Sequence, residues 1–144
     1  MDDLYDADVL EWSERQAKLL RRRAAGELVN EADLDWPNIA EEIESVGRDQ
    51  LHAVESLLLQ ALLHVLKAEA WPLSRDAPAW RAEAIRFRAQ ASNRFTPSMR
   101  RKLDLDRIYR QALRAVPESL DGQAPLPLQR NCLATLDDLL SDDP

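Results

Sequence analysis

The sequence is poor in glycine, cysteine and aromatic residues. Of its 144 residues, three are Gly, one is Cys and 6% are aromatic. Leu, Ala, Glu and Arg prevail over the β-branched residues that strands favour, so the composition predicts an all-α protein. The lone Cys132 can form neither an internal disulfide nor a thiolate metal site. A reducing compartment follows, and we expect a cytoplasmic location.

The chain also lacks the marks of export, membrane insertion and nucleotide binding. Its first residues, MDDLYDADVLEW, are acidic where a signal peptide would be basic. No unbroken apolar run approaches the roughly 20 residues that span a bilayer. No Gly-rich loop is present to hold a phosphate. We therefore expect no membrane partner and no nucleotide cofactor.

Charge is unevenly distributed along the chain. The formal net charge is −7, yet residues 75–114 contain eleven Arg or Lys against four Asp or Glu. Such a basic stretch could meet the phosphates of a nucleic acid. In a compact helical protein, basic helices also complement acidic ones packed beside them, and this is the interpretation we favour. A nucleic-acid partner is the less favoured alternative.

Apolar periodicity, proline and capping residues predict four main helices and a short C-terminal one. Asp35 and Asp76 are expected to precede the second and third helices, each followed two residues later by a proline in the first turn. Thr96 with Pro97 repeats this start signal for the fourth. We expect an up-and-down bundle organised around the long second helix, forming one domain over residues 1–144. The expected helices cover about residues 6–23, 36–70, 77–94, 97–116 and 131–140.

The long second helix has an apolar face and one glycine. Ile39, Ile43, Val46 and Val54 fall on that face at 100° per residue. Beyond residue 57 the apolar arc widens to more than half the circumference. Gly47 is expected to mark either a bend or a point where another backbone approaches closely.

His64 belongs to a polar strip on the same helix. Gln60 and Lys67 lie one turn away from it, and a nearby lysine disfavours a bound cation. We interpret His64 as a boundary residue, hydrogen-bonded and packed on one side, rather than as a ligand or proton carrier. His52 lies roughly 120° away around the helix, so the two histidines cannot share one site.

Catalytic and metal-binding patterns are weak. A di-iron bundle needs two Glu-x-x-His pairs, and the sequence offers Asp49-x-x-His52 once. Glu41 and Glu44 share a face but have no histidine within a turn, so we predict no metal site. Arg48 and His52 resemble the arginine and histidine of helical HEPN-type ribonucleases, although the gap between them is too short. Neither a metal nor any other cofactor is expected.

Cys132 is expected near the start of the last helix, where its pKa could be lowered. It has no histidine near it in sequence, so thiol catalysis lacks a partner. Packing in the core is the favoured interpretation for a free cysteine.

Five blocks of the sequence resemble the bacterial domain-of-unknown-function family numbered 29. They are YDADVLEWSERQAKLLR, NIAEEIESVGRDQ, LLLQALLHVLKAEAWP, APAWRAEAIRFR and NCLATLDDLL, and they cover nearly the whole chain. The most specific are AEEIESVGR, residues 40–48, and LLHVLK, residues 62–67. After the cysteine the family tends to have a proline and an aromatic, where this chain has Leu133 and Ala134. The resemblance implies a small helical fold and confers no enzymatic activity.

The resemblance also marks a set of candidate functional or network residues. If Gln16, Glu44 and Gln50 lie near the seam between the first two helices, they would form a buried polar network that fixes their register. A ligand pocket lined by the same groups is the functional rival. The eight residues in the family's motif blocks are Trp12, Gln16, Glu41, Glu44, Gly47, Arg48, His64 and Lys67.

Two hypotheses of function follow from these patterns. The first is a non-enzymatic helical module that binds another copy of itself or a partner protein through the wide apolar arc around Leu59 and Leu63. The second is an RNA-processing enzyme or nucleic-acid factor centred on Arg48 and His52, or on His64, with the basic stretch beside them. The enzyme hypothesis is the weaker one, because it requires basic side chains gathered into one exposed patch.

Overall fold

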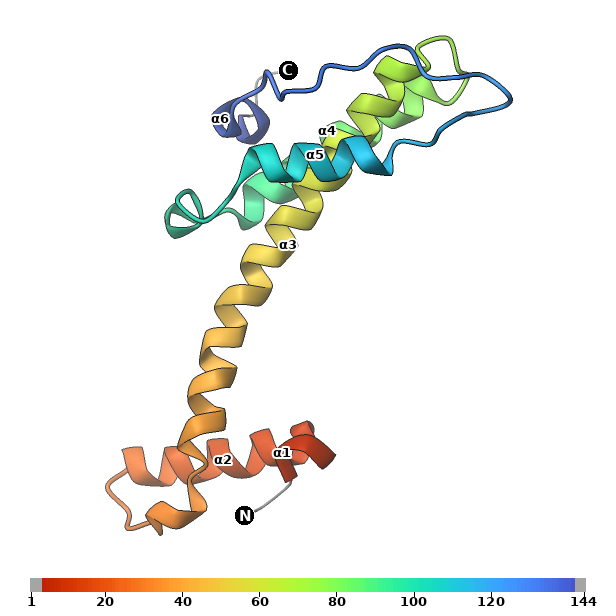
Figure 1. Ribbon diagram of the computed structural model, residues 1–144. Helices are drawn as coiled ribbons and strands as arrows, with labels where there is room; N and C mark the ends of the chain where they lie inside the picture. Colours follow the sequence, from red (N-terminus) through yellow and green to blue (C-terminus); the bar gives the residue numbers. More distant parts are fainter. Residues whose placement is uncertain (1–3, 142–144) are drawn as a thin grey trace. The chain divides into compact units, whose positions relative to one another are not determined.

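The computed structural model describes residues 4–141, and within that range it contains helices and no β-strand (Figure 1). The predicted all-α fold, with four main helices, a short C-terminal helix and one long central helix, is confirmed. The α-helices are α1 (Leu4–Ala7), α2 (Val9–Ala24), α3 (Trp36–Ala70), α4 (Ala77–Arg94), α5 (Leu105–Ala115) and α6 (Leu136–Leu140). Two 3-10 helices, η1 (Glu31–Asp33) and η2 (Pro97–Met99), lie in the connections.

The chain divides into two compact units, Met1–Arg48 (unit 1) and Asp49–Pro144 (unit 2). The boundary between them falls inside α3, directly after the AEEIESVGR block. The start of α3 therefore belongs to unit 1 and the remainder to unit 2. A single domain over residues 1–144 stays a prediction.

The N-terminal helical segment is interrupted at Asp8, where one helix had been expected. Asp8 accepts a hydrogen bond from the backbone N–H of Glu11 at 3.1 Å and so acts as the N-cap of α2. The Asp8 side chain satisfies a backbone N–H that has no helical partner at the start of α2. A new helix therefore begins after Asp8, and α1 is separate from it. At the other end, Gly26 adopts a φ of 83°, the left-handed conformation common just after a helix.

Unit 1 has a small core built around one tryptophan. Trp12, Leu34 and Ile39 are its buried members. Tyr5 packs edge-on against Trp12 with ring centroids 4.9 Å apart, and its hydroxyl donates to Glu42 at 2.6 Å. The aromatic pair and this hydrogen bond attach the start of the chain to α3.

The apolar face of α3 is exposed soon after the start of the helix. Ile39 is buried, whereas Ile43 and Val46 are 69% and 64% exposed. A Cβ atom added at Gly47 would meet nothing within 4 Å, so no other backbone among residues 4–141 approaches this glycine. The predicted close approach within the chain is therefore wrong. The predicted bend stays a prediction.

Unit 2 has a larger and almost purely apolar core. Val54 and Leu58 on α3 are completely buried and pack with Ile108 and Ala112 of α5. On α4, Trp80, Ala84 and Ala91 are buried, while Phe87 is half-buried. A second cluster lies at the end of α3 and the start of α4, formed by Ala68, Ala70, Trp71, Ala77 and Trp80.

The fourth main helix begins later than predicted. Thr96 and Pro97 begin only the short η2, and α5 starts at Leu105. Asp104 is the reason, because its carboxylate accepts the backbone N–H of Arg107 at 3.1 Å and so caps a new helix.

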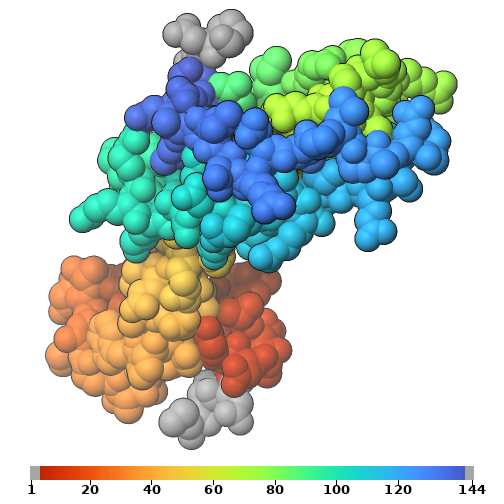
Figure 2. Space-filling model, turned by 45° about the horizontal axis from the view of Figure 1, so that its top comes forward, coloured from red at the N-terminus to blue at the C-terminus, as the bar shows by residue number. Residues whose placement is uncertain are grey.

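The connection after α5 lies along one side of unit 2, as the blue segment in Figure 2 shows. Trp71 donates its indole N–H to the Gln123 carbonyl at 3.1 Å, and Tyr109 donates its hydroxyl to the Gln129 carbonyl at 2.6 Å. The backbone N–H of Leu126 reaches the last residue of α3 at 3.0 Å. An irregular segment is thus fixed by its own backbone carbonyls and N–H groups.

The last helix starts at Leu136 rather than near Asn131. Thr135 and Asp138 form a reciprocal capping box, and this sets the start. Two residues of α4 hold the other end of α6. Arg88 donates to the carbonyls of Asp138 and Leu139 at 2.8 and 3.0 Å, and Ser92 donates to the carbonyl of Leu140 at 3.0 Å.

By length and composition alone, α3 could cross a membrane, since one stretch of it reaches a mean hydropathy of 1.2. A count of unbroken apolar residues does not reveal this, because isolated polar residues interrupt the stretch. The core helix of a soluble protein meets the same criterion, so one such helix is weak evidence. The absence of a membrane partner stays a prediction.

Candidate functional site

A polar network joins α2 to the start of α3. Asp35 directly precedes α3, and its carbonyl accepts the first helical hydrogen bond, from Ile39 at 2.9 Å. Its carboxylate accepts the indole N–H of Trp12 at 3.0 Å and the side-chain amide of Asn38 at 2.8 Å. The predicted N-cap residue is therefore also the centre of a tertiary contact.

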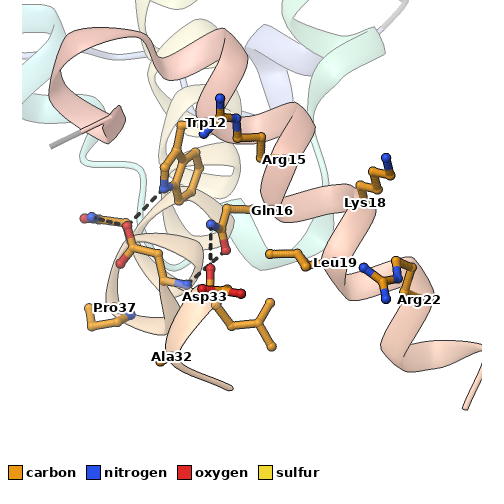
Figure 3. Close-up of a pocket in the computed structure, with 12 residues that line it drawn as sticks. Trp12, Arg15, Gln16, Lys18, Leu19, Arg22, Ala32, Asp33 and Pro37 are labelled. Carbon is orange, nitrogen blue, oxygen red and sulfur yellow. Dashed lines mark hydrogen bonds between the residues drawn. The ribbon is translucent and has the colours of Figure 1, made fainter. Parts of the chain in front are cut away.

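Gln16 completes the network with both ends of its amide. Its Nε2 donates to the Asp33 carbonyl at 3.1 Å, and its Oε1 accepts the backbone N–H of Asp35 at 2.9 Å. Figure 3 shows Trp12 and Gln16 pointing from α2 toward this segment, with dashed lines for the bonds. Gln16 thus provides both hydrogen bonds that an irregular backbone needs.

The network keeps Asp35 in its charged form. The pKa of Asp35 is lowered below its usual value, chiefly because the Asn38 side chain donates to the carboxylate, and the Trp12 indole acts in the same direction. Partial burial opposes the shift without reversing it. A carboxylate held in this way is a poor proton donor, so the arrangement favours structure over acid catalysis.

The same segments enclose a groove of about 860 Å³ in unit 1. One edge carries Arg15, Lys18 and Arg22 of α2, and Leu19 and Leu34 provide apolar surface. Trp12 and Gln16 form the polar network and also line this groove. The structural role and the ligand-binding role considered for these residues therefore concern the same place. The remaining lining residues are Ala32, Asp33, Asp35, Pro37 and Asn38.

Three of the other candidate residues form an exposed ion cluster on α3. The guanidinium of Arg48 lies 2.6 Å from Glu41 and 3.7 Å from Glu44. Glu44 is therefore turned to Arg48, and Gln50 is exposed and belongs to unit 2. The expectation that these two residues join Gln16 at the seam is wrong, because in α3 they lie beyond the turn that contacts α2.

His64 and Lys67 lie at the boundary between α3 and α4 in unit 2. The half-buried His64 places Nδ1 2.7 Å from the carbonyl of Gln60, and its ring centroid lies 5.4 Å from that of Phe87. The ammonium of Lys67 lies 4.7 Å from the ring centroid of Trp80. Hydrogen bonding and one-sided packing are the features expected of a boundary histidine.

Four of the ten arginines of residues 75–114 have separate partners among the described residues. Arg88 binds the carbonyls of α6, Arg100 lies 2.8 Å from Asp137, and Arg107 lies 3.5 Å from Glu55. Arg86 pairs with a glutamate on its own helix. These arginines thus bind acidic side chains and carbonyl groups of the same chain, as the interpretation favoured from the sequence expects. The contacts do not support nucleic-acid binding, which stays a prediction.

Cys132 is half-buried and packs against the main core cluster of unit 2. Its thiol donates to the Ala134 carbonyl at 3.4 Å. Burial raises the pKa of Cys132, which keeps the thiol protonated and disfavours nucleophilic chemistry. Among residues 4–141, no three His, Cys, Asp or Glu side chains gather as metal ligands would.

Asp33 and Asn38 are the site residues that sequence reasoning missed. Asn38 follows Asp35 by three residues, the spacing at which a side chain reaches back to a helix cap, and this was the available signal. Asp33 contributes through its backbone carbonyl, so its side-chain type carries no signal.

Comparison with known proteins agrees on the fold and assigns no activity. The family model described as "Domain of unknown function DUF29" matches residues 4–143. A crystal structure of an alpha-helical protein of unknown function from Rhodospirillum rubrum superposes with a TM-score of 0.65 at 28% sequence identity. The match covers 96% of this chain and 90% of that chain. The comparison with curated proteins gave no match.

Proposed function

This chain belongs to the family of unknown function DUF29, and from that premise we propose that it is a non-enzymatic module that associates with a second copy of itself. The surface we assign to this role is the exposed face of α3 formed by Ile43, Val46 and Gly47, here called the α3 face. The observation that carries the proposal is a small exposed apolar surface beside Gly47, a glycine that nothing else in the described chain requires.

The α3 face is apolar and uncovered. Ile43 and Val46 are 69% and 64% exposed, and they lie three residues apart on one side of the helix. Burying a Val or Ile side chain contributes about 1.5–3 kcal/mol, which the single chain forgoes here. By contrast, Leu59 and Leu63, the surface expected from the sequence, are half-buried against the main core of unit 2. The α3 face is therefore the better interaction surface.

Nothing described in unit 1 requires a glycine at position 47. It lies inside a continuous helix in an ordinary helical conformation, and a Cβ atom there would meet nothing within 4 Å. Glycine in a helix interior costs about 1 kcal/mol relative to alanine. A second helix approaching the backbone closely at Gly47 would supply the missing reason, because a side chain would hold it away.

The ion cluster of Glu41, Glu44 and Arg48 lies roughly 140° around α3 from the α3 face, at 100° per residue, so it leaves that face uncharged. A two-fold axis brings the same surface of two copies together, so the apolar face of one copy would meet the apolar face of the other.

The contact is small, so the association is expected to be weak. Interfaces below about 1,200 Å² are typical of transient complexes. A non-enzymatic role also suits the candidate residues, because Trp12, Gln16 and Arg48 are already engaged by other groups of the chain.

Sedimentation velocity from micromolar to millimolar concentration tests the proposal. We expect a concentration-dependent dimer. The substitution Val46→Glu places a charge in the apolar contact and should weaken dimerisation about tenfold or more. Ile85→Glu is the matched control, because Ile85 on α4 is also 64% exposed and lies outside the α3 face. Equal effects of the two substitutions, or a wild-type monomer throughout, would overturn the proposal.

Gly47→Ala separates dimerisation from folding. Alanine fits the open space at this position and favours helix, so the free energy of unfolding should rise by about 1 kcal/mol in thermal or urea unfolding. The same substitution should weaken the dimer, because the added methyl group lies at the closest point of the two helices. A variant that is more stable and equally dimeric would contradict the role of Gly47.

A further inference from the structure

We propose that the groove of unit 1 binds a small amphipathic anion, with a carboxylate head on the α2 edge and a hydrocarbon body on the apolar floor. The groove shares no residue with the α3 face, so this inference stands apart from self-association. Its volume of about 860 Å³ lies in the range of 300–1,000 Å³ typical of small-molecule sites.

The basic edge of the groove carries one cation that has no ion pair among residues 4–141. Arg15 pairs with Glu11 at 2.8 Å, and Arg22 pairs with Glu27 at 2.9 Å. Lys18 lies between them on the same side of α2 and has no ion pair among the described residues. A ligand anion is the group that would complete this row of charges.

The floor beside Lys18 is apolar and rigidly held. Leu34 is 5% exposed, and Leu19 is half-buried one residue from Lys18. The bonds from Trp12 and Gln16 to the segment opposite fix the distance between the two walls (Figure 3). A preformed site loses little entropy on binding, so even a small ligand can bind detectably.

The two carboxylates of the groove orient the ligand. Asp35 is directed to Trp12 and Asn38, so its charge is already compensated by two hydrogen bonds. Asp33 is exposed and repels an anion from the opposite wall. The ligand head is therefore expected beside Lys18, with the chain extending over Leu19.

Titration calorimetry with octanoate and decanoate, below their micelle concentrations, tests the inference on the full chain. Affinity should rise roughly fourfold per added methylene, as expected when the hydrocarbon is buried. Amide shifts in NMR spectra should gather in residues 12–22 and 32–38. Decanol should bind more weakly than decanoate, because it lacks the charge.

Two substitutions with opposite expected signs complete the test. Lys18→Gln should weaken decanoate binding about tenfold, and Asp33→Asn should strengthen it about threefold. Lys102→Gln, at an exposed lysine of unit 2, is the control and should change nothing. No binding of decanoate, affinity independent of chain length, or equal effects of Lys18→Gln and Lys102→Gln would overturn the inference. None of these outcomes bears on dimerisation, which is measured without ligand.

Discussion

The two units reach stability by different means. In unit 2, Val54 and Leu58 are completely buried, and the main cluster gathers residues from α3, α4, α5 and α6. In unit 1 three of the described residues are buried, and a carboxylate with two side-chain partners lies beside them. The first unit depends on directed hydrogen bonds, and the second depends on buried apolar area.

This difference decides what each unit tolerates. An apolar core accepts changes of shape at moderate cost but loses much stability when a large side chain is removed. A polar network loses stability when a single donor is removed, even if the volume is preserved. The following predictions test that contrast, starting with the largest effect.

Leu58→Ala should cause the largest loss. Leu58 is 0% exposed, and truncation leaves a cavity that the surrounding helices cannot fill. We expect the free energy of unfolding to fall by about 3–4 kcal/mol in urea denaturation. Leu133→Ala is the control, because Leu133 is 79% exposed and should change stability by less than about 0.5 kcal/mol. Similar losses at both positions would refute the assignment of the unit 2 core.

Trp12→Phe should cost about 2 kcal/mol, because it removes a hydrogen bond to the charged Asp35 while keeping an aromatic ring. Trp71→Phe in unit 2 is the matched substitution. Trp71 is 4% exposed, close to the 5% of Trp12, but donates to the neutral carbonyl of Gln123. Its loss should be nearer 1 kcal/mol. Hydrogen exchange measured separately in each unit would reveal the order, and a larger loss at Trp71 would contradict the comparison.

The smallest effect concerns alkaline pH. The hydrogen bond to Glu42 is the main cause that raises the pKa of Tyr5 to about 12. A raised pKa stabilises the folded state fully below the ordinary value of 10.0, and this contribution is lost as pH rises through about 12. Burial also raises the pKa of Tyr109, so phenolate absorbance measured against pH should show late titration of both tyrosines, and Tyr5→Phe should remove the contribution of Tyr5 alone. A Tyr5 that titrates near its ordinary pKa would exclude the bond.

Local signals allowed much of the fold to be predicted. The start of α3 followed from Asp35 and the proline in its first turn, because caps and prolines act on their immediate neighbours. The missed boundaries at Asp8 and Asp104 have local causes too, but in both places an aspartate cap lies within an apolar pattern that continues across it.

The site was predicted only in part, because its contacts are tertiary. Gln16 was correctly placed at the seam between α2 and α3, since it lies on the inward face of α2. Glu44 was placed there wrongly, because helical periodicity gives the side of a helix and not how far along it the neighbouring helix extends. The exposure of Ile43 and Val46 was missed for the same reason.

The hydrogen bonds from α4 to the carbonyls of α6 have a consequence for folding during synthesis. A helix of five residues is far too short to persist alone, so Leu136–Leu140 acquires its shape only when Arg88 and Ser92 capture its carbonyls. Chains fold as they emerge during synthesis, and Leu139 closes the main cluster of unit 2. Until Leu139 leaves the ribosome, the apolar side chains that it covers in the main cluster of unit 2 stay exposed to water.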